Sequence, residues 1–442
     1  VAALTQLAAD LRAILGPSVK IGYAADWTEY GAHVPTPGEV RFPLDPLFAS
    51  PAVDFIGVDA YWPLADWRDG ADHLDASEAG SIYDRAYLAR RLASGEAFDW
   101  HYASEAARAA QTRTPITDGA YGEPWIYRSK DLVGWWSNAH HERVGGARLA
   151  APTAWAPKSK PIWLTEIGCP AVDRGANQPN VFPDPKSSES ARPYFSRGER
   201  DDLMLIAALE AIIARFDPSS AVFDPAANPV SPAYGGRMVE PSRIHAWAWD
   251  ARPFPAFPLN AEAWGDADNF DKGHWLNGRL ESAPLDALIR ALAADLGAPA
   301  GLIGDVAVDG HVDGYVVDRP MSARAALDPL LALFAADFRA RGDRLDVVSR
   351  ARARPCAIAS DDLVPSAAGV SFELARAQET ELPAAATLAI SEGVVDFRKR
   401  SLSSRRLETT SRRESRNDIA AVMQSGEAAR RLGQELTGAR TR

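Results

Sequence analysis

The segment KPIWLTEIGCP, from Lys160 to Pro170, is an apolar run that ends in polar residues and a turn. The same plan occurs three more times along the chain, in VKIGYAADW (19–27), DFIGVDAYWPL (54–64) and RIHAWAWDARP (243–253). Near-continuous apolar runs are typical of parallel strands that are buried on both faces. We therefore expect adjacent parallel strands, in chain order, at Val19–Ala25, Asp54–Asp59, Ile162–Glu166 and Ile244–Trp249.

Apolar stripes with helical spacing lie before and between these runs. They are Leu4–Leu7–Leu11–Leu15, Leu203–Ile206–Leu209–Ile213–Phe216 and Leu285–Leu288–Leu292–Leu296. Ser196 and Glu199 have the spacing of a capping box ahead of the second stripe. Strands that alternate with helices predict a parallel α/β fold. Four strands form either half of a (β/α)₈ barrel or the whole of a small open sheet.

Two long insertions and a change of composition divide the chain. The insertions run from Leu64 to Lys160 and from Gly168 to Arg197, and in a barrel such insertions sit on the face that carries the active site. An Ala-, Gly- and Pro-rich join near Gly297 predicts one domain over residues 1–297 and a mixed α+β domain over 298–442. In the second domain we expect a helix over 323–341 with the stripe Leu327–Leu330–Phe334–Phe338, a strand at Leu345–Ser349, and a polar amphipathic helix over Asn417–Leu436.

Composition excludes several classes of protein. The formal net charge of −11 argues against a nucleic-acid binder, which would be basic. The basic segment Phe397–Arg416 also contains acidic residues and fits a solvated face or a protein contact better. The only cysteines, Cys169 and Cys356, are too few for a disulfide framework or a cysteine-rich zinc site. We expect no cofactor and no metal.

The ends and the hydropathy of the chain add two expectations. No run of eighteen apolar residues occurs, so no transmembrane helix is expected. The chain starts at Val1, inside a helical pattern and without Met, so we expect it to be part of a longer protein.

Glu166 is the best candidate for chemistry because it ends an apolar strand just before a turn. Barrel enzymes place catalytic groups at the carboxyl ends of strands. Glycoside hydrolysis needs two carboxyl groups, one to protonate the leaving oxygen and one to attack the anomeric carbon or activate water. The alternative is a glutamate that pairs with an arginine at the barrel rim.

Other candidates are weaker, and each has a structural alternative. Tyr61 could support the nucleophile or be a rim aromatic, and Asp59 could be a second carboxylate or a helix cap. Asp26 could contact substrate. Trp249 could form the floor of a sugar site or belong to the core, and Trp136 and His140 could lie on a sugar-contacting loop or on plain surface.

Long and unusual strings give the chain a specific resemblance. They are KIGYAADWTEY, DFIGVDAYWPL, ADWRDG, ARAAQTRTPITDGAYGEPW, KDLVGWWSNAHHER, KPIWLTEIGCPAVDRGANQPNVFPDPKSSES and GHWLNGRL. Over residues 1 to about 295 the chain resembles the glycoside-hydrolase-like TIM-barrel domain of gene transfer agent and prophage tail proteins. VDGYVVDRPMSARAALDPL resembles the tail-hub domain that follows this barrel in the same proteins.

The resemblance implies a fold and a role. The fold would be strands five to eight of a TIM barrel with long insertions, followed by a baseplate hub domain. Glu166 would be the nucleophile of a retaining hydrolase, and the acid/base would end strand four, upstream of Val1.

The implied partners are other tail proteins and a cell-envelope polysaccharide or peptidoglycan, with a possible homotrimer. The protein would be cytoplasmic during assembly and then part of the tail of a released particle. The rival interpretation is a non-catalytic, structural or carbohydrate-binding barrel.

Overall fold

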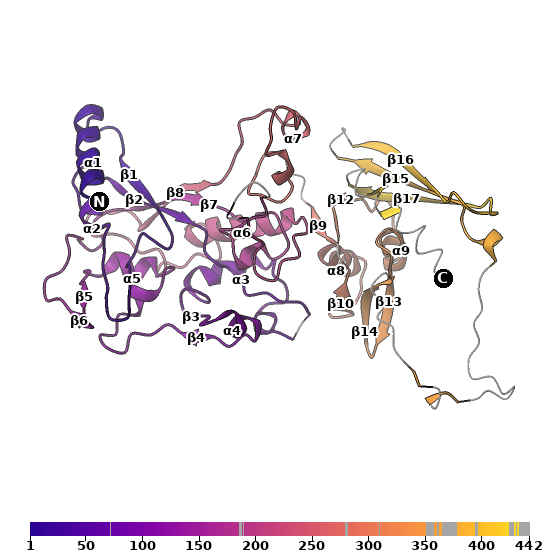
Figure 1. Ribbon diagram of the computed structural model, residues 1–442, viewed down its shortest axis with the longest axis horizontal. Helices are drawn as coiled ribbons and strands as arrows, with labels where there is room; N and C mark the ends of the chain where they lie inside the picture. Colours follow the sequence, from indigo (N-terminus) through magenta and orange to yellow (C-terminus); the bar gives the residue numbers. More distant parts are fainter. Residues whose placement is uncertain are drawn as a thin grey trace. The chain divides into compact units, whose positions relative to one another are not determined.

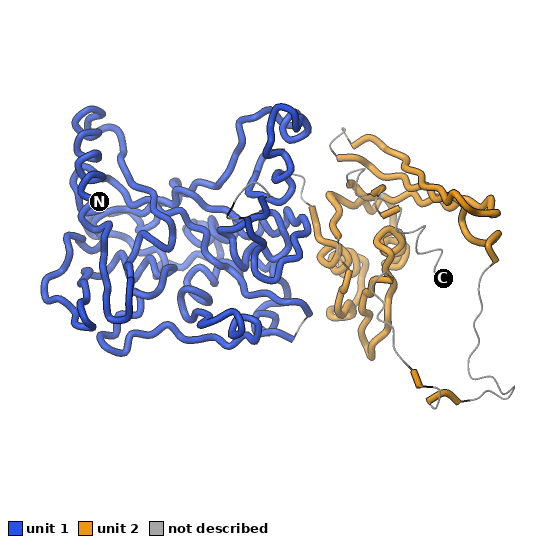
Figure 2. Tube along the Cα trace, viewed as in Figure 1, with its two compact units in different colours: residues 1–279 blue, residues 280–442 orange. Residues whose placement is uncertain are grey.

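The structure is a computed structural model, and it divides the chain into two compact units, Val1–Arg279 and Leu280–Arg442 (Figure 2). The residues it describes are 1–70, 72–184, 188, 190–278, 282–308, 310–350, 358–359, 362–364, 378–393, 397–423, 428–429 and 431–432. None of the helices in these ranges is long and apolar enough to cross a membrane.

A four-stranded parallel sheet organises the first unit (Figure 1). Its strands, in spatial order, are β1 (Gly22–Asp26), β2 (Phe55–Ala60), β7 (Ile162–Ile167) and β8 (Val239–Ala246). All three neighbouring pairs are parallel, so the prediction of four adjacent parallel strands in chain order is confirmed. The last strand was placed too late, because β8 begins at Val239 and ends three residues before Trp249.

The two faces of this sheet differ in burial. One face is closed by the main core of the unit, which contains Ile56, Val58, Ile162 and Leu164. The other face is open over its outer strands, where Gly22 and Ala24 of β1 and Arg243 and His245 of β8 are exposed. The expectation that these strands are buried on both faces therefore fails for β1 and β8.

The helices of the first unit precede β1 or follow the strands. They include α1 (Ala2–Leu15), α2 (Asp45–Phe48), α6 (Asp202–Phe216) and α7 (Ala256–Leu259), with the 3₁₀ turns η4 (Gly175–Asn177) and η5 (Ala267–Asn269). Helix α1 confirms the predicted helix, but Leu7, Leu11 and Leu15 are exposed and only Ala8 is fully buried. The apolar contact with the rest of the unit runs through Leu4 and Ala8, and Arg12 adds an ion pair with Asp54.

Helix α6 packs against β8 and corrects the predicted cap. Its N-cap is Asp201, whose side chain accepts from the backbone N–H of Met204, and not Ser196. The buried face also differs from the predicted stripe, because Ile213 is exposed. Consecutive buried residues such as Met204 and Leu205 show that the helix is covered over more than one stripe.

The β2–β7 insertion is built from short elements and shares the main core through several tryptophans. The elements are η1 (Asp75–Ser77), α3 (Arg85–Arg90), η2 (Arg91–Ala93), β3 (Trp100–His101), α4 (Glu105–Ala109), β4 (Thr114–Pro115), η3 (Pro124–Tyr127), α5 (Leu132–Ser137), β5 (Arg143–Val144) and β6 (Ala147–Arg148). The insertion is thus an ordered wall and not a simple crossover.

In the part that the structure describes, the second unit is built mainly from two sheets, a short strand pair and two eleven-residue helices. The first sheet has the strand order β10 (Ile303–Ala307), β14 (Arg344–Ser349), β13 (Ala336–Arg341). The second sheet has the strand order β12 (Gly314–Tyr315), β17 (Glu414–Val422), β15 (Ala385–Glu392), β16 (Arg398–Arg405). The other elements are β9 (Ala283–Pro284), α8 (Leu285–Asp295), β11 (His311–Val312), α9 (Ala323–Leu333) and η8 (Glu379–Glu381). This composition agrees with the expected mixed α+β domain.

The boundary at residue 297 was placed too late. Leu285, Ile289 and Leu292 of α8 pack in the same cluster as Leu327 and Leu330 of α9. Helix α8 therefore belongs to the second unit, and the division falls after Arg279.

Two predicted helices of the second unit are corrected. Helix α9 ends at Leu333, and Phe338 lies in β13, which forms a hairpin with β14 around Gly342 at φ 63°. The predicted strand over Leu345–Ser349 is confirmed within β14. The predicted C-terminal helix is wrong over 417–422, which belong to β17, since pairing with β15 outweighs the local helical pattern. Residues 428–429 and 431–432 are helical, as predicted, whereas residues 424–427, 430 and those from 433 onward lie outside the described residues, as does Cys356.

Candidate active site at the strand ends

Three carboxylates stand in register at the carboxyl edge of the sheet. Asp26 of β1 is the register partner of Asp59 of β2, and Asp59 is the partner of Glu166 of β7. A register shift between Val58 and Asp59 brings Glu166, and not Thr165, opposite Asp59. We call Asp26, Asp59 and Glu166 the rim cluster.

Tyr61 holds the carboxylate of Glu166. Its hydroxyl donates to Glu166 Oε2 over 2.6 Å, as predicted from the strand-end positions of the two residues. The rim cluster has a second hydroxyl contact, because Thr165 Oγ1 donates to Asp59 Oδ1 over 2.8 Å. The catalytic roles of Glu166 and Tyr61 remain predictions.

The position of Tyr61 depends on close packing at Gly168. A Cβ atom on Gly168 would lie 2.7 Å from Tyr61 Cε1 and 2.8 Å from His274 Cδ2. The His274 ring meets the Tyr61 ring edge-on at 5.6 Å and its Nε2 lies 2.9 Å from the carbonyl oxygen of Pro179. Glycine is therefore required where the chain leaves β7.

The pKa values of two rim carboxyls, Glu166 and Asp59, are raised by their surroundings. Burial raises the pKa of Glu166 and the Asp59 carboxylate raises it further, whereas the hydrogen bond from Tyr61 lowers it. Burial also raises the pKa of Asp59, and the nearby Asp26 carboxylate raises it further. The hydrogen bond from Thr165 lowers it in part. Perturbed carboxyls at strand ends are candidates for acid, base or nucleophilic chemistry.

A metal-binding site needs several His, Cys, Asp or Glu side chains close together. Among the described residues, no group of three or more His, Cys, Asp and Glu side chains is placed to hold a metal ion.

Three predicted substrate contacts are not at the rim. Trp136 is fully buried, and its indole N–H donates to the carbonyl oxygen of Lys160 over 2.7 Å. His140 is also fully buried, with Nδ1 2.8 Å from Asp45 Oδ2 and its ring stacked on Phe42. Neither side chain can reach a substrate in this structure, so both predictions are corrected.

The third is Trp249, which lies past the end of β8 with 75% of its surface exposed and is not a strand residue. Trp247 was missed, although it pairs with the residue that follows Glu166 in β7. It follows Ala246, the last residue of β8, its backbone N–H donates to the carbonyl oxygen of Ile167, and 49% of its surface is exposed. The signal was present in the string AWAW (246–249), but the late placement of β8 selected the wrong tryptophan.

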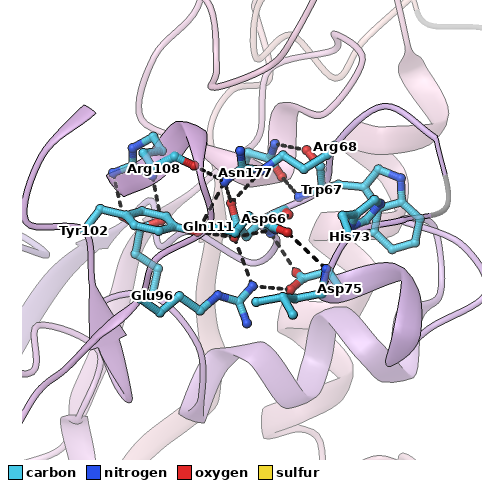
Figure 3. A network of polar contacts seen from close by, with 12 residues as sticks. Asp66, Trp67, Arg68, His73, Asp75, Glu96, Tyr102, Arg108, Gln111 and Asn177 are labelled. Atoms are coloured by element: carbon cyan, nitrogen blue, oxygen red, sulfur yellow. Dashed lines mark hydrogen bonds and ion pairs between the residues drawn. The ribbon is translucent and has the colours of Figure 1, made fainter. Parts of the chain in front are cut away.

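A second group of carboxylates lies in the insertion and is bound by arginines. Asp75 accepts from Arg91 over 2.9 Å and from Arg113 over 2.6 Å, and Asp66 accepts from Arg68 and Arg113, each over 2.9 Å. Tyr102 and Gln111 also donate to Asp66 (Figure 3). We call these two carboxylates and three arginines the arginine cluster.

The arginine cluster fixes the wall beside the rim. Asn177, from the β7–β8 connection, accepts from the backbone N–H of Trp67 over 2.9 Å and donates to its carbonyl oxygen over 3.0 Å (Figure 3). Burial alone would raise the pKa of Asp75, but Arg91, Tyr87 and Arg113 together hold it below its ordinary value. The contact between Asn177 and Trp67 thus joins the two long insertions a few residues beyond Tyr61.

Comparisons with known proteins agree with this division of the chain. Residues 1–258 match the family model described as "GTA TIM-barrel-like domain", and residues 322–442 match the one described as "Putative phage tail protein". A solved chain from "Virion of native gene transfer agent (GTA) particle" is 23% identical, with a TM-score of 0.36. That match covers 43% of this chain and 44% of the solved chain. No curated protein matches the chain.

Proposed function

This chain belongs to the family of GTA TIM-barrel-like domains, and on that premise we propose that it is a tail component whose barrel domain hydrolyses a cell-envelope glycan. The family and the tail-protein match confirm the resemblance seen in the sequence. The observation that carries the hydrolytic part is the 2.6 Å hydrogen bond from Tyr61 to Glu166 at the end of β7. This hydrogen bond holds one carboxylate oxygen of Glu166, at the end of the strand. The other carboxylate oxygen of Glu166 has no hydrogen-bond partner among the described side chains.

The finer fold is part of the same proposal. We take β1, β2, β7 and β8 as strands five to eight of a (β/α)₈ barrel. Their parallel order and the open face of the outer strands support this, because the interior face of half a barrel would be uncovered.

The proposed reaction is a retaining double displacement. A Glu166 oxygen attacks the anomeric carbon, the bond to the leaving oxygen breaks, and a separate carboxyl group protonates that oxygen. Water then cleaves the glycosyl ester after giving a proton to the same carboxyl group. The acid/base would come from outside these four strands, about 5–5.5 Å from Glu166 if configuration is retained.

Tyr61 has two effects on the attacking group. Its hydroxyl orients the carboxylate, and its hydrogen bond opposes the rise in the pKa of Glu166 that burial and Asp59 cause. A nucleophile must be ionised when it attacks, so this donor favours the reactive form.

A non-catalytic, glycan-binding barrel is the second candidate. The direction of the Glu166 pKa shift favours it, because a raised pKa disfavours the ionised form that a nucleophile needs. Hydrolysis separates the two functions.

The role of the second unit extends the proposal. Its match to a phage tail family supports a place in the baseplate hub, next to other tail proteins. A homotrimer, assembly in the cytoplasm and export as part of a released particle complete this proposal.

The experiment is hydrolysis of purified peptidoglycan and capsular polysaccharide, followed as release of reducing ends by the intact protein. Glu166→Gln should abolish release. Glu210→Gln is the matched control, because Glu210 is an exposed residue of α6 that pairs with Arg85. Wild-type rates in Glu166→Gln would exclude Glu166 as nucleophile, and an inactive wild type would favour the binding module.

A further inference from the structure

A cavity of about 320 Å³ lies beside the carboxyl end of β1, and the proposed hydrolysis does not use it. Its volume falls within the roughly 300–1,000 Å³ of ligand pockets. The lining residues come from the segment after β1 and from the β2–β7 insertion. The aromatic residues among them are Trp27, Tyr30, His33, Trp125, Tyr127 and Trp135.

The floor and the mouth of this cavity differ in character. Tyr30, Trp125 and Trp135 are buried, and the Tyr30 and Trp135 rings meet edge-on at 5.2 Å. At the mouth, Thr28 and His33 are exposed. An aromatic floor with a polar mouth suits a pyranose ring, which has apolar C–H faces and hydroxyl groups around its edge.

The floor also contains a hydrogen-bond donor without an acceptor. The indole Nε1 of Trp135 is buried, and it has no hydrogen-bond partner in the part of the chain that the structure describes. The adjoining Cδ1 atom lies 3.8 Å from the position that a Cβ on Gly31 would take, and Gly31 lines the cavity. The donor edge of the indole therefore faces the Gly31 side, where an oxygen of a ligand could accept from it.

The cavity lies in line with the rim cluster. Trp27 follows Asp26, and its backbone N–H donates to the carbonyl oxygen of Asp59 over 3.0 Å. Asp59 in turn is the register partner of Glu166. With neighbouring strands about 4.8 Å apart, the cavity begins roughly 10 Å from the β7 end, a span that a few linked sugars can cover.

We propose that this cavity is a binding subsite for one pyranose residue of the glycan chain whose bond lies at Glu166. The inference rests on the proposed function, since that function supplies the glycan. Trp27 gives the ring a stacking surface at the entrance, and Trp135 gives it a hydrogen-bond donor at the floor.

The test follows indole N–H resonances of the intact protein by NMR while a peptide-free peptidoglycan tetrasaccharide is added. The Trp135 resonance, assigned from its loss in Trp135→Phe, should move on binding. Trp135→Phe should weaken binding about three- to ten-fold, the effect of one lost hydrogen bond. Trp27→Ala should weaken it about ten-fold through lost stacking.

Trp62→Phe is the matched control. Trp62 also has a buried indole N–H without a partner among the described residues, but it does not line the cavity. The affinity of the Trp62→Phe variant for the tetrasaccharide should stay within two-fold of wild type. Equal losses in Trp62→Phe and Trp135→Phe would overturn the subsite.

The two proposals can fail separately. Glu166→Gln should retain the Trp135 shift while hydrolysis is lost, and hydrolysis that persists in this variant would refute only the nucleophile. A Trp135 resonance that does not move when the tetrasaccharide is added overturns the subsite, whether or not the glycan is hydrolysed.

Discussion

The rim cluster and the arginine cluster contain the same kind of side chain in opposite surroundings. Arginines bind both carboxylates of the arginine cluster, where Asp75 has no exposed surface. Among the described residues, no lysine or arginine forms an ion pair with Asp26, Asp59 or Glu166. The pKa of Asp75 is accordingly lowered, whereas the pKa values of Asp59 and Glu166 are raised.

This difference separates structural carboxylates from candidate chemical ones. A carboxylate surrounded by guanidinium groups stays ionised at all ordinary pH values and serves to join segments of the chain. A carboxyl group that only hydroxyls and other carboxyls approach holds its proton more readily, as a group that takes part in acid–base chemistry must. Burial and charge partners, more than residue type, therefore point to the rim.

The largest expected effect is on stability in the arginine cluster. Asp75→Asn leaves Arg91 and Arg113 partly buried without their shared charge, and breaking a buried ion pair costs about 3–5 kcal/mol. Denaturant unfolding followed by tryptophan fluorescence measures this in the first unit, because all thirteen tryptophans lie there. Asp59→Asn is the comparison and should not lower stability at pH 7. Equal losses in both variants would remove the distinction between the clusters.

A smaller effect is expected on catalysis at Tyr61. Tyr61→Phe removes the donor to Glu166, and a hydrogen bond to a charged group is worth about 1.5–3 kcal/mol, so kcat/KM should fall roughly ten- to a hundred-fold. Tyr83→Phe removes a similar hydroxyl–carboxylate bond, 2.7 Å long, from Asp201 away from the rim. That control should keep the wild-type kcat/KM, and a similar loss in both variants would argue for a general effect of stability.

The smallest expected effect is a shift in pH dependence. The reactive form of Glu166 is ionised, so the rate rises as pH increases through the pKa of Glu166. The Asp59 carboxylate raises that pKa, so Asp59→Asn should move the acidic limb of kcat/KM to lower pH. Asp26→Asn should move it less, because Asp26 lies one strand farther away. A shift to higher pH in Asp59→Asn would contradict the proposed coupling.

The sequence predicted the sheet well because apolar runs and strand ends are local features. The parallel order and the Tyr61–Glu166 contact both follow from strands that end at one edge. The register shift at Thr165 could not be predicted, since it depends on how β7 pairs with β2. The same limit applies to β8, where Pro241 within the strand hid its early start.

Long-range pairing explains the other errors. The arginine cluster joins Asp66 and Asp75 to Arg113, and Asn177 pairs with Trp67 from 110 residues away, so no local pattern reveals it. Trp136 and His140 have polar atoms, but an insertion that forms part of the core buries them. In the second unit, sheet pairing converts Phe338 and residues 417–422 from predicted helix to strand.

Covalent trapping tests the central claim, that Glu166 is the nucleophile, most directly. The probe is a glycosyl fluoride of the sugar released in the hydrolysis assay, with a second fluorine on its ring. Its attack by the enzyme needs no general acid, because fluoride leaves without a proton. The Glu166 carboxylate would displace fluoride, and the second fluorine would slow breakdown of the ester. Mass spectrometry should then show a glycosyl adduct on the peptide that contains Glu166 and none in Glu166→Gln. An adduct on Asp59 or Asp26, or no adduct in a protein that hydrolyses the glycan, would contradict the account.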